Sequence, residues 1–209
     1  AINVLYKGPP AQPMESPLEI EIKVKCDDFC ALVDNHPELG WTVVEPRHFE
    51  SNDVFEQPED ALKRRGSILR LRVAGGRATL TYKGLVAESA GTNVKIREEL
   101  ETDVTSPETL AEIFGRLGLR RSFRYEKYRT VYRLRLGDVE VLAMRDELPF
   151  GEFLELEGSE ASVRSIADTL EIDESRYVAE SYIGIQAMLC AARGVELEDL
   201  VFGEAAAGI

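Results

Sequence analysis

The chain has 209 residues, of which 25 are Lys or Arg and 38 are Asp or Glu, which gives a formal net charge of −13. With 44% hydrophobic and 30% charged residues, the composition is that of a globular domain and excludes a disordered polyelectrolyte. The acidic balance argues against a protein that binds nucleic acid by bulk electrostatics, although the charge inside one cleft can oppose that of the whole surface.

The sequence shows no membrane or targeting segment. No apolar run approaches the ~18 residues of a membrane span, and the N-terminus lacks a basic stretch followed by an apolar one. The three cysteines are an odd number without metal-type spacing, which favours thiols in a reducing compartment. We therefore expect a cytoplasmic protein with neither a membrane nor a nucleic-acid partner.

Proline and glycine break up the start of the chain at Gly8-Pro9-Pro10 and again at Pro13. We therefore expect an N-terminal tail over residues 1–17 and one domain over 18–195. A C-terminal tail is expected over 196–209, with one more helical turn in its acidic stretch 196–204.

The elements expected along the domain are mostly strands. In chain order they are a strand over 18–25, a helix over 27–35, a strand over 43–55 in which Pro46 indicates an edge position or a bend, a short helix over 59–65, a hairpin of strands 68–73 and 78–83, and a strand over 94–101. The next element is a helix that begins at Ser106-Pro107, carries Leu110, Ile113 and Leu117 on one face, and stops at Gly118. The remaining elements are strands over 125–136, 139–146 and 153–157 and helices over 160–170 and 180–192. Strands with one-sided alternation predict a closed or nearly closed antiparallel sheet.

The polar faces of these strands are unusual because nearly every strand carries two like charges two residues apart. If helices cover the apolar faces, the charged faces line the inside of the sheet, which is stable only when it is wet and holds ions. The alternative is that each polar face is simply solvated. The residues concerned are Glu19, Glu21, Lys23 and Lys25, Arg70 and Arg72, Thr81 and Lys83, Lys95, Arg97, Glu99 and Glu101, Lys127 and Arg129, and Glu155 and Glu157.

The charges are also sorted by strand, with carboxylates on the first and last strands and cations on the middle ones. Pairs of carboxylates are hard oxygen ligands for Mg²⁺ or Mn²⁺, whereas Arg and Lys suit phosphate oxygens. We expect the cations to repel one another in an empty interior and a polyanion bound with a divalent metal to neutralise them. A nucleoside triphosphate and inorganic polyphosphate are ligands of this kind.

Six short motifs resemble, in order, those of the CYTH family, also called triphosphate tunnel metalloenzymes. The likeness covers residues 18 to about 189. The motifs are Glu19-x-Glu21-x-Lys23, Leu69-Arg70-x-Arg72, Thr81-x-Lys83, Arg97-x-Glu99-x-Glu101, Lys127-x-Arg129 and Gly151-x-Phe153-x-Glu155-x-Glu157.

The resemblance implies an α+β fold in which an eight-stranded antiparallel β-barrel encloses a tunnel and helices surround it. It implies a divalent metal, Mg²⁺ or Mn²⁺, held by Glu19, Glu21, Asp146, Glu155 and Glu157. The phosphates of a triphosphate-containing small molecule would be bound by Lys23, Arg70, Arg72, Lys83, Lys95, Arg97, Lys127 and Arg129, and the catalytic set would be Glu19, Glu21, Lys23, Glu155 and Glu157. The protein would be a monomer or a homodimer.

Asp146 departs from the family pattern, because Arg145 precedes it where the family more often has an apolar residue. By strand alternation Asp146 shares a face with Leu142 and Met144, which gives the metal assignment little support. Ser181-Tyr182 resembles a pair found in the cyclase-like branch of the family, and we expect it to pack the last helix on the barrel.

Three functions fit these motifs. The favoured one is a metal-dependent hydrolase of tripolyphosphate, thiamine triphosphate or a nucleoside triphosphate, with water attacking the terminal phosphate. The second is a class IV-type adenylate cyclase that converts ATP to cyclic AMP and pyrophosphate. The third is a polyphosphate-binding module without catalysis. The same tunnel serves all three, so the motifs do not separate them.

Overall fold

The computed structural model describes residues 18–85 and 95–203. The expected N-terminal tail and most of the loop between the strands at 78–83 and 94–101 lie outside the described residues. Among those that are described, no helix is long and apolar enough to span a membrane.

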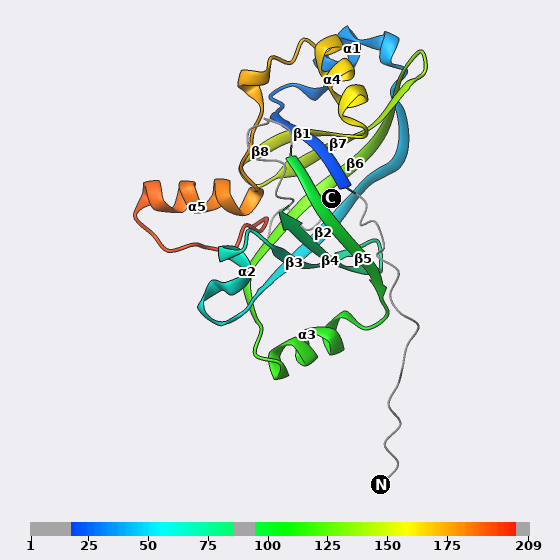
Figure 1. Ribbon diagram of the computed structural model, residues 1–209. Coiled ribbons are helices and arrows are strands. Elements are labelled where there is room, and N and C mark those ends of the chain that lie inside the picture. The colour runs from blue at the N-terminus through cyan, green and yellow to red at the C-terminus, as the bar shows by residue number, and fades with distance from the viewer. Residues whose placement is uncertain (1–17, 86–94, 204–209) are drawn as a thin grey trace, which may run out of the picture.

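The strands form one closed antiparallel barrel, as expected from the sequence (Figure 1). Neighbouring strands pair in the order β1-β5-β4-β3-β2-β6-β7-β8, and β8 closes the ring on β1. The strands are β1 (Leu18–Lys25), β2 (Thr42–Glu56), β3 (Ile68–Ala74), β4 (Arg77–Leu85), β5 (Lys95–Val104), β6 (Arg120–Leu136), β7 (Val139–Leu148) and β8 (Gly151–Glu157). The expected bend at Pro46 is present, since the register of β2 against β6 shifts between Glu45 and His48.

Helices lie outside the barrel (Figure 1). Near one end are α1 (Phe29–Asn35) and α4 (Glu160–Thr169), and α3 (Pro107–Arg116) lies beyond the other end. The short α2 (Ala61–Arg64) and the longer α5 (Tyr182–Arg193) complete the set, and α5 meets the barrel with its N-terminal end and projects away from it. Ser181 caps α5 by accepting a hydrogen bond from the Gly184 amide at 3.1 Å.

The largest part of the hydrophobic core lies between the barrel wall and the helices. In the largest cluster Ile22, Leu154 and Leu156 point outward from β1 and β8 and pack with Val163 and Ile166 of α4, all of them buried. Burying such a side chain stabilises the fold by about 1.5–3 kcal/mol. Because successive strand residues face opposite sides, this outward packing turns the charged residues between them into the barrel.

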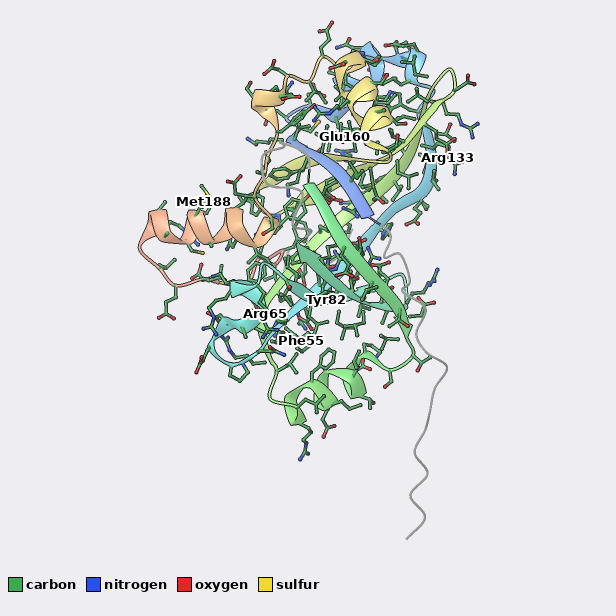
Figure 2. The ribbon with its side chains drawn as sticks, viewed as in Figure 1. Phe55, Arg65, Tyr82, Arg133, Glu160 and Met188 are labelled. Atoms are coloured by element: carbon green, nitrogen blue, oxygen red, sulfur yellow. The ribbon has the colours of Figure 1, made fainter. Side chains whose placement is uncertain are left out.

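The expected apolar face of α3 is confirmed at Leu110 but wrong at Ile113 and Leu117. Ile113 and Leu117 are 48% and 70% exposed, while Phe114 packs edge-on against Phe55 with ring centroids 5.0 Å apart. Figure 2 shows Phe55 on the side of the barrel that faces α3. The helix contacts the barrel through Leu110 and Phe114, which are four residues apart and therefore lie on the same face.

The expected helical turn after residue 196 is also wrong, because residues 196–203 form no helix. Leu200 forms a parallel bridge with Tyr125, and its amide and carbonyl bond to Arg124 and Glu126 of β6, both at 2.8 Å. Pairing of β6 with β7 begins only at Tyr128, so the preceding edge of β6 is open. The C-terminal segment fills that edge and buries Leu200.

Candidate functional site

Two cavities lie inside the barrel and adjoin each other, and we call the two together the tunnel. One cavity, of about 270 Å³, lies at the end next to α5, and the other, of about 680 Å³, opens at the opposite end. The two share the lining residues Arg72, Glu101, Arg129, Met144 and Glu157. Two adjoining cavities with charged lining agree with the interior expected from strand alternation.

Most of the predicted site residues line this tunnel. They are Glu21, Lys23, Arg70, Arg72, Lys83, Lys127, Arg129, Glu155 and Glu157. The side chains of Glu19, Lys95 and Arg97 lie outside the described residues, although the β1–β5 register pairs Glu19 with Arg97 and Glu21 with Lys95. The alternative of simply solvated strand faces is wrong for this set, since Lys23 and Lys127 are only 4% and 2% exposed.

Asp146 is the centre of a buried ionic cluster. Its carboxylate accepts hydrogen bonds from Lys127 Nζ at 2.8 Å, from Arg129 Nε and Nη2 at 2.6 Å each, and from the Tyr182 hydroxyl at 2.9 Å. Burial raises the pKa of Asp146, but the charges of Arg129 and Lys127 outweigh it and hold this pKa well below the usual range. To bind a metal ion, Asp146 would have to exchange one of these donors for the ion.

Glu50 on β2 belongs to the same cluster and was missed in the sequence. It is 2% exposed, and its carboxylate lies 3.5 Å from Lys127 Nζ, 3.9 Å from Arg72 Nη1 and 3.4 Å from His48 Nε2. Burial raises the pKa of Glu50, but Lys127, Arg129 and Arg72 lower it to about 2. The carboxylate is therefore charged at neutral pH and fixes two cations of the tunnel wall.

A second group of contacts connects β3, β4 and β5. Arg70 Nη2 donates to Thr81 Oγ1 at 3.2 Å, and Thr81 donates to Glu101 Oε1 at 2.6 Å. Arg70 and Arg72 both lie 3.7 Å from the same Glu101 oxygen, and Lys83 Nζ lies 3.2 Å from Glu99. The expectation of mutually repelling cations in an empty interior is therefore wrong, because the carboxylates of neighbouring strands neutralise them.

The carboxylates of β1 and β8 lie side by side. The β1–β8 register places Glu21 directly opposite Glu157 and Lys23 opposite Glu155, and all four side chains line the tunnel. Glu155 Oε2 accepts from Arg129 Nη2 at 2.5 Å. Within the described part of the chain, no three His, Cys, Asp or Glu side chains form a cluster that could hold a metal ion by themselves.

The sequence and the fold of the chain have known relatives. The family model for the CYTH domain matches residues 17–182. The chain belongs to the CYTH domain family. A curated relative from Methanocaldococcus jannaschii, named "Putative adenylate cyclase MJ0240", is 27% identical over 181 residues, which are 82% of this chain and 99% of the relative.

Solved structures share the CYTH tunnel fold. A protein from Vibrio parahaemolyticus, described as a "putative adenylate cyclase", has a TM-score of 0.65 at 19% identity, covering 80% of this chain and 97% of its own. PH1012 from Pyrococcus horikoshii has a TM-score of 0.61 at 25% identity, covering 78% and 96%. HpAC1 from Hippeastrum, whose description names "a dominant triphophatase activity", has a TM-score of 0.56 at 19% identity, covering 86% and 97%.

Tyr182 connects helix α5 to the interior of this CYTH tunnel. It packs on the barrel as expected, with its ring 5.3 Å from that of Phe153. Its ring also lies 4.5 Å from Lys23 Nζ, and its hydroxyl donates to Asp146. Burial and the charge of Asp146 raise the pKa of Tyr182 well above its ordinary value, so the hydroxyl keeps its proton. The expectation of a packing residue alone was incomplete, since Tyr182 also positions two charges of the site.

Asn52 is a further buried polar residue that the sequence analysis missed, and it lies on β2 between Glu50 and Val54, which line the CYTH tunnel. On β2 it lies two residues from Glu50, and the register pairs it with Arg72 on one side and Tyr125 on the other. It is fully buried, and neither its amide nitrogen nor its amide oxygen has a hydrogen-bond partner among the described residues. Such a pair of buried polar atoms calls for a water or ligand atom beside it.

Proposed function

We propose that this CYTH protein is a divalent-metal-dependent triphosphate hydrolase, acting on inorganic or organic triphosphate. The observation that supports this most directly is the row of cations along a closed tunnel. The described cations that line it are Lys23, Arg70, Arg72, Lys83, Lys127 and Arg129. Phosphate oxygens are the ligands that such a set binds best, and Arg can bind them bidentately.

The ion pairs suggest how the work is divided among these cations. Arg129 is held by short bonds of 2.5–2.6 Å to Asp146 and Glu155, so its position is fixed. Arg72 lies 3.7 Å and 3.9 Å from its carboxylates, beyond hydrogen-bond distance, and keeps its donors for another partner. We propose that Arg70 and Arg72 bind phosphate oxygens directly, while Lys127 and Arg129 supply fixed positive charge.

The carboxylates fit a divalent metal of the Mg²⁺ or Mn²⁺ type. Such ions are commonly held by one or two protein carboxylates together with phosphate oxygens of the substrate, and Glu21 and Glu157 are a facing pair of this kind. Glu19, Glu155 and Asp146 remain further candidates. When bound, the metal neutralises charge on the phosphates and polarises the phosphoryl group.

In the hydrolysis a water oxygen forms a bond to the terminal phosphorus, and the bond from that phosphorus to its bridging oxygen breaks. The bridging oxygen leaves with the diphosphate, and the water protons pass to phosphate oxygens or solvent. In this proposal Arg72 and Arg129 stabilise the negative charge on the transferred group. The reaction needs no nucleophilic side chain.

A second candidate is a class IV-type adenylate cyclase, in which the ribose 3′-hydroxyl of ATP attacks the α-phosphate and pyrophosphate leaves. The observation in its favour is the name of the M. jannaschii relative, which matches almost over its full length. The description of the Hippeastrum protein favours the hydrolase. A polyphosphate-binding module that does not catalyse is the third alternative.

The test is a product assay. The purified chain is given tripolyphosphate, thiamine triphosphate or ATP with Mg²⁺ or Mn²⁺. Orthophosphate is the product we expect. Cyclic AMP with pyrophosphate would establish the cyclase instead, and binding without any product would establish the module. Glu157→Gln is the companion variant, which should need more metal for half-maximal activity while its melting temperature stays close to that of the wild type.

We further propose that residues 18–195 act as one tunnel domain in the cytoplasm, as a monomer or a homodimer. Limited proteolysis of the full chain, followed by light scattering of the product, would test the boundaries and the oligomeric state.

A further inference from the structure

The chain after α5 is bound to the barrel as an additional strand. We call residues 198–202 the C-terminal strap. The amide and carbonyl of Leu200 bond to β6 at 2.8 Å each, and the Asp199 carboxylate accepts a hydrogen bond from the Arg124 amide at 2.7 Å. The match to the CYTH family model ends at residue 182. The strap is therefore a part of this structure that the family match does not cover.

The strap also holds α5. Gly194, with a φ of +71°, ends the helix, and the chain then returns to the barrel (Figure 1). Gln186 Nε2 on α5 donates to the Glu198 carbonyl at 3.3 Å, and Arg193 Nη2 lies 2.9 Å from Glu198 Oε2. Because the strap is bonded both to β6 and to α5, it ties the helix that begins at Tyr182 to the barrel.

Leu200 packs with the two tyrosines that reach the charges of the tunnel. It is 5% exposed and belongs to the same buried cluster as Tyr125 and Tyr182, whose rings lie 6.2 Å apart. The Tyr125 hydroxyl accepts a hydrogen bond from Arg70 Nη1 at 3.4 Å, and the Tyr182 hydroxyl donates to Asp146 at 2.9 Å. Each ring therefore has apolar neighbours in the cluster and a hydroxyl on a charged group of the tunnel.

We propose that Leu200 is a positioning residue of the triphosphate site and acts on it through Tyr125 and Tyr182. This rests on the proposed function and adds the element that fixes the geometry of its site. Removal of the Leu200 side chain leaves a cavity, and neighbouring rings in a close-packed cluster can shift into it. Hydrogen bonds weaken steeply when their geometry departs from the optimum, so such a shift loosens the bonds to Arg70 and Asp146.

The disturbance reaches the phosphate-binding cations through these two residues. Asp146 accepts hydrogen bonds from Lys127 and Arg129, and Arg70 is itself proposed to bind phosphate. A Leu200 that only filled the core would behave differently, because its loss would lower the free energy of unfolding and leave the affinity for phosphate unchanged. The affinity for tripolyphosphate, measured apart from stability, therefore separates the two roles.

Isothermal titration calorimetry of tripolyphosphate makes this separation, once in EDTA, which prevents metal-dependent turnover, and once with Mg²⁺. Unfolded protein lowers the number of sites, whereas displaced tyrosines raise the Kd of the sites that remain. We expect Leu200→Ala to raise Kd by about fivefold, as couplings between residues in contact do. The matched control is Val201→Ala, at a strap residue that is 42% exposed, and it should change Kd by less than about twofold.

The decisive comparison repeats Leu200→Ala in a Tyr125→Phe/Tyr182→Phe background, which keeps both rings but lacks both hydroxyl bonds. If Leu200 acts through those bonds, the substitution should change Kd there by less than about twofold. If Leu200→Ala does not fold, the milder Leu200→Val takes its place in both backgrounds. The same fold-change in both backgrounds would overturn the proposal, as would an unchanged Kd in the wild-type background or an equal rise in Val201→Ala.

The proposed function fails on a different result. A wild type that binds tripolyphosphate but releases no orthophosphate is not the proposed hydrolase, and the comparison of Kd values still tests Leu200. A wild type that binds no tripolyphosphate, with or without Mg²⁺, would refute both proposals.

Discussion

Replacing Glu50 by Gln should destabilise the protein in a manner that depends on pH. The pKa of Glu50 falls from an ordinary 4.5 to about 2 in the folded chain. At 1.36 kcal/mol per unit, this shift means that the charged carboxylate adds about 3 kcal/mol to the free energy of unfolding at pH 7. Glu50 is 2% exposed, so solvent screening reduces this figure little.

The sign follows from the direction of the shift. A lowered carboxyl pKa stabilises the fold above pH 4.5, where the unfolded chain is also ionised, and this contribution is lost as the pH falls from 4.5 through 2. Glu50→Gln removes the charge that faces Lys127 and Arg72 at every pH. The variant should therefore be about 3 kcal/mol less stable at pH 7, and the difference from the wild type should shrink below pH 4.

Urea denaturation of both proteins at pH 7, 5, 4 and 3 measures this difference. The matched control is Glu112→Gln, whose carboxylate is 70% exposed and lies 3.2 Å from Arg116. An exposed pair of this kind is worth about 0.5 kcal/mol. A loss in Glu50→Gln that is the same at pH 7 and pH 3, or no larger than that of the control, would refute the reasoning.

Three more substitutions test the tunnel. Arg72→Ala should lower the melting temperature without ligand, because Glu50 loses a counter-charge. The variant should also show a smaller rise in melting temperature when tripolyphosphate and Mg²⁺ are added. An equal rise in variant and wild type would contradict a ligand contact at Arg72. Tyr182→Phe keeps the ring but removes the hydrogen bond to Asp146, so denaturation should show a loss of about 1.5–3 kcal/mol, and an unchanged stability would count against that bond. Asn52→Leu should leave the free energy of unfolding equal or higher, because each unpaired buried polar atom costs about 1–3 kcal/mol. The same variant should bind tripolyphosphate more weakly in calorimetry. A clear loss of stability would show that the amide is paired.

Much of the barrel was predictable because alternation in a strand has a period of two. Once Leu71 is known to face outward, Arg70 and Arg72 must face the interior, and the same reasoning places Lys127 and Arg129 on β6. For Asp146 alternation gave little support, because its face also carries Leu142 and Met144; only the structure shows that these two residues line the tunnel.

Glu50 was not predictable in this way. The register of β2 shifts on both sides of Glu45, so the parity of its first residues does not carry through to Glu50 and Asn52. The sequence also could not show that carboxylates of other strands neutralise each cation, because residues such as Arg70 on β3 and Glu101 on β5 meet only when β3, β4 and β5 pair in this register. Tyr182 was underestimated because the way α5 meets the barrel depends on tertiary packing.

The most direct test of the account is a crystal structure of the wild type with tripolyphosphate and Mn²⁺, whose anomalous scattering locates the metal. The account predicts the triphosphate inside the barrel, with its oxygens on Arg70 and Arg72, and Mn²⁺ beside Glu21 and Glu157. A triphosphate on the outer surface, or an empty tunnel at a saturating concentration of ligand, would contradict it.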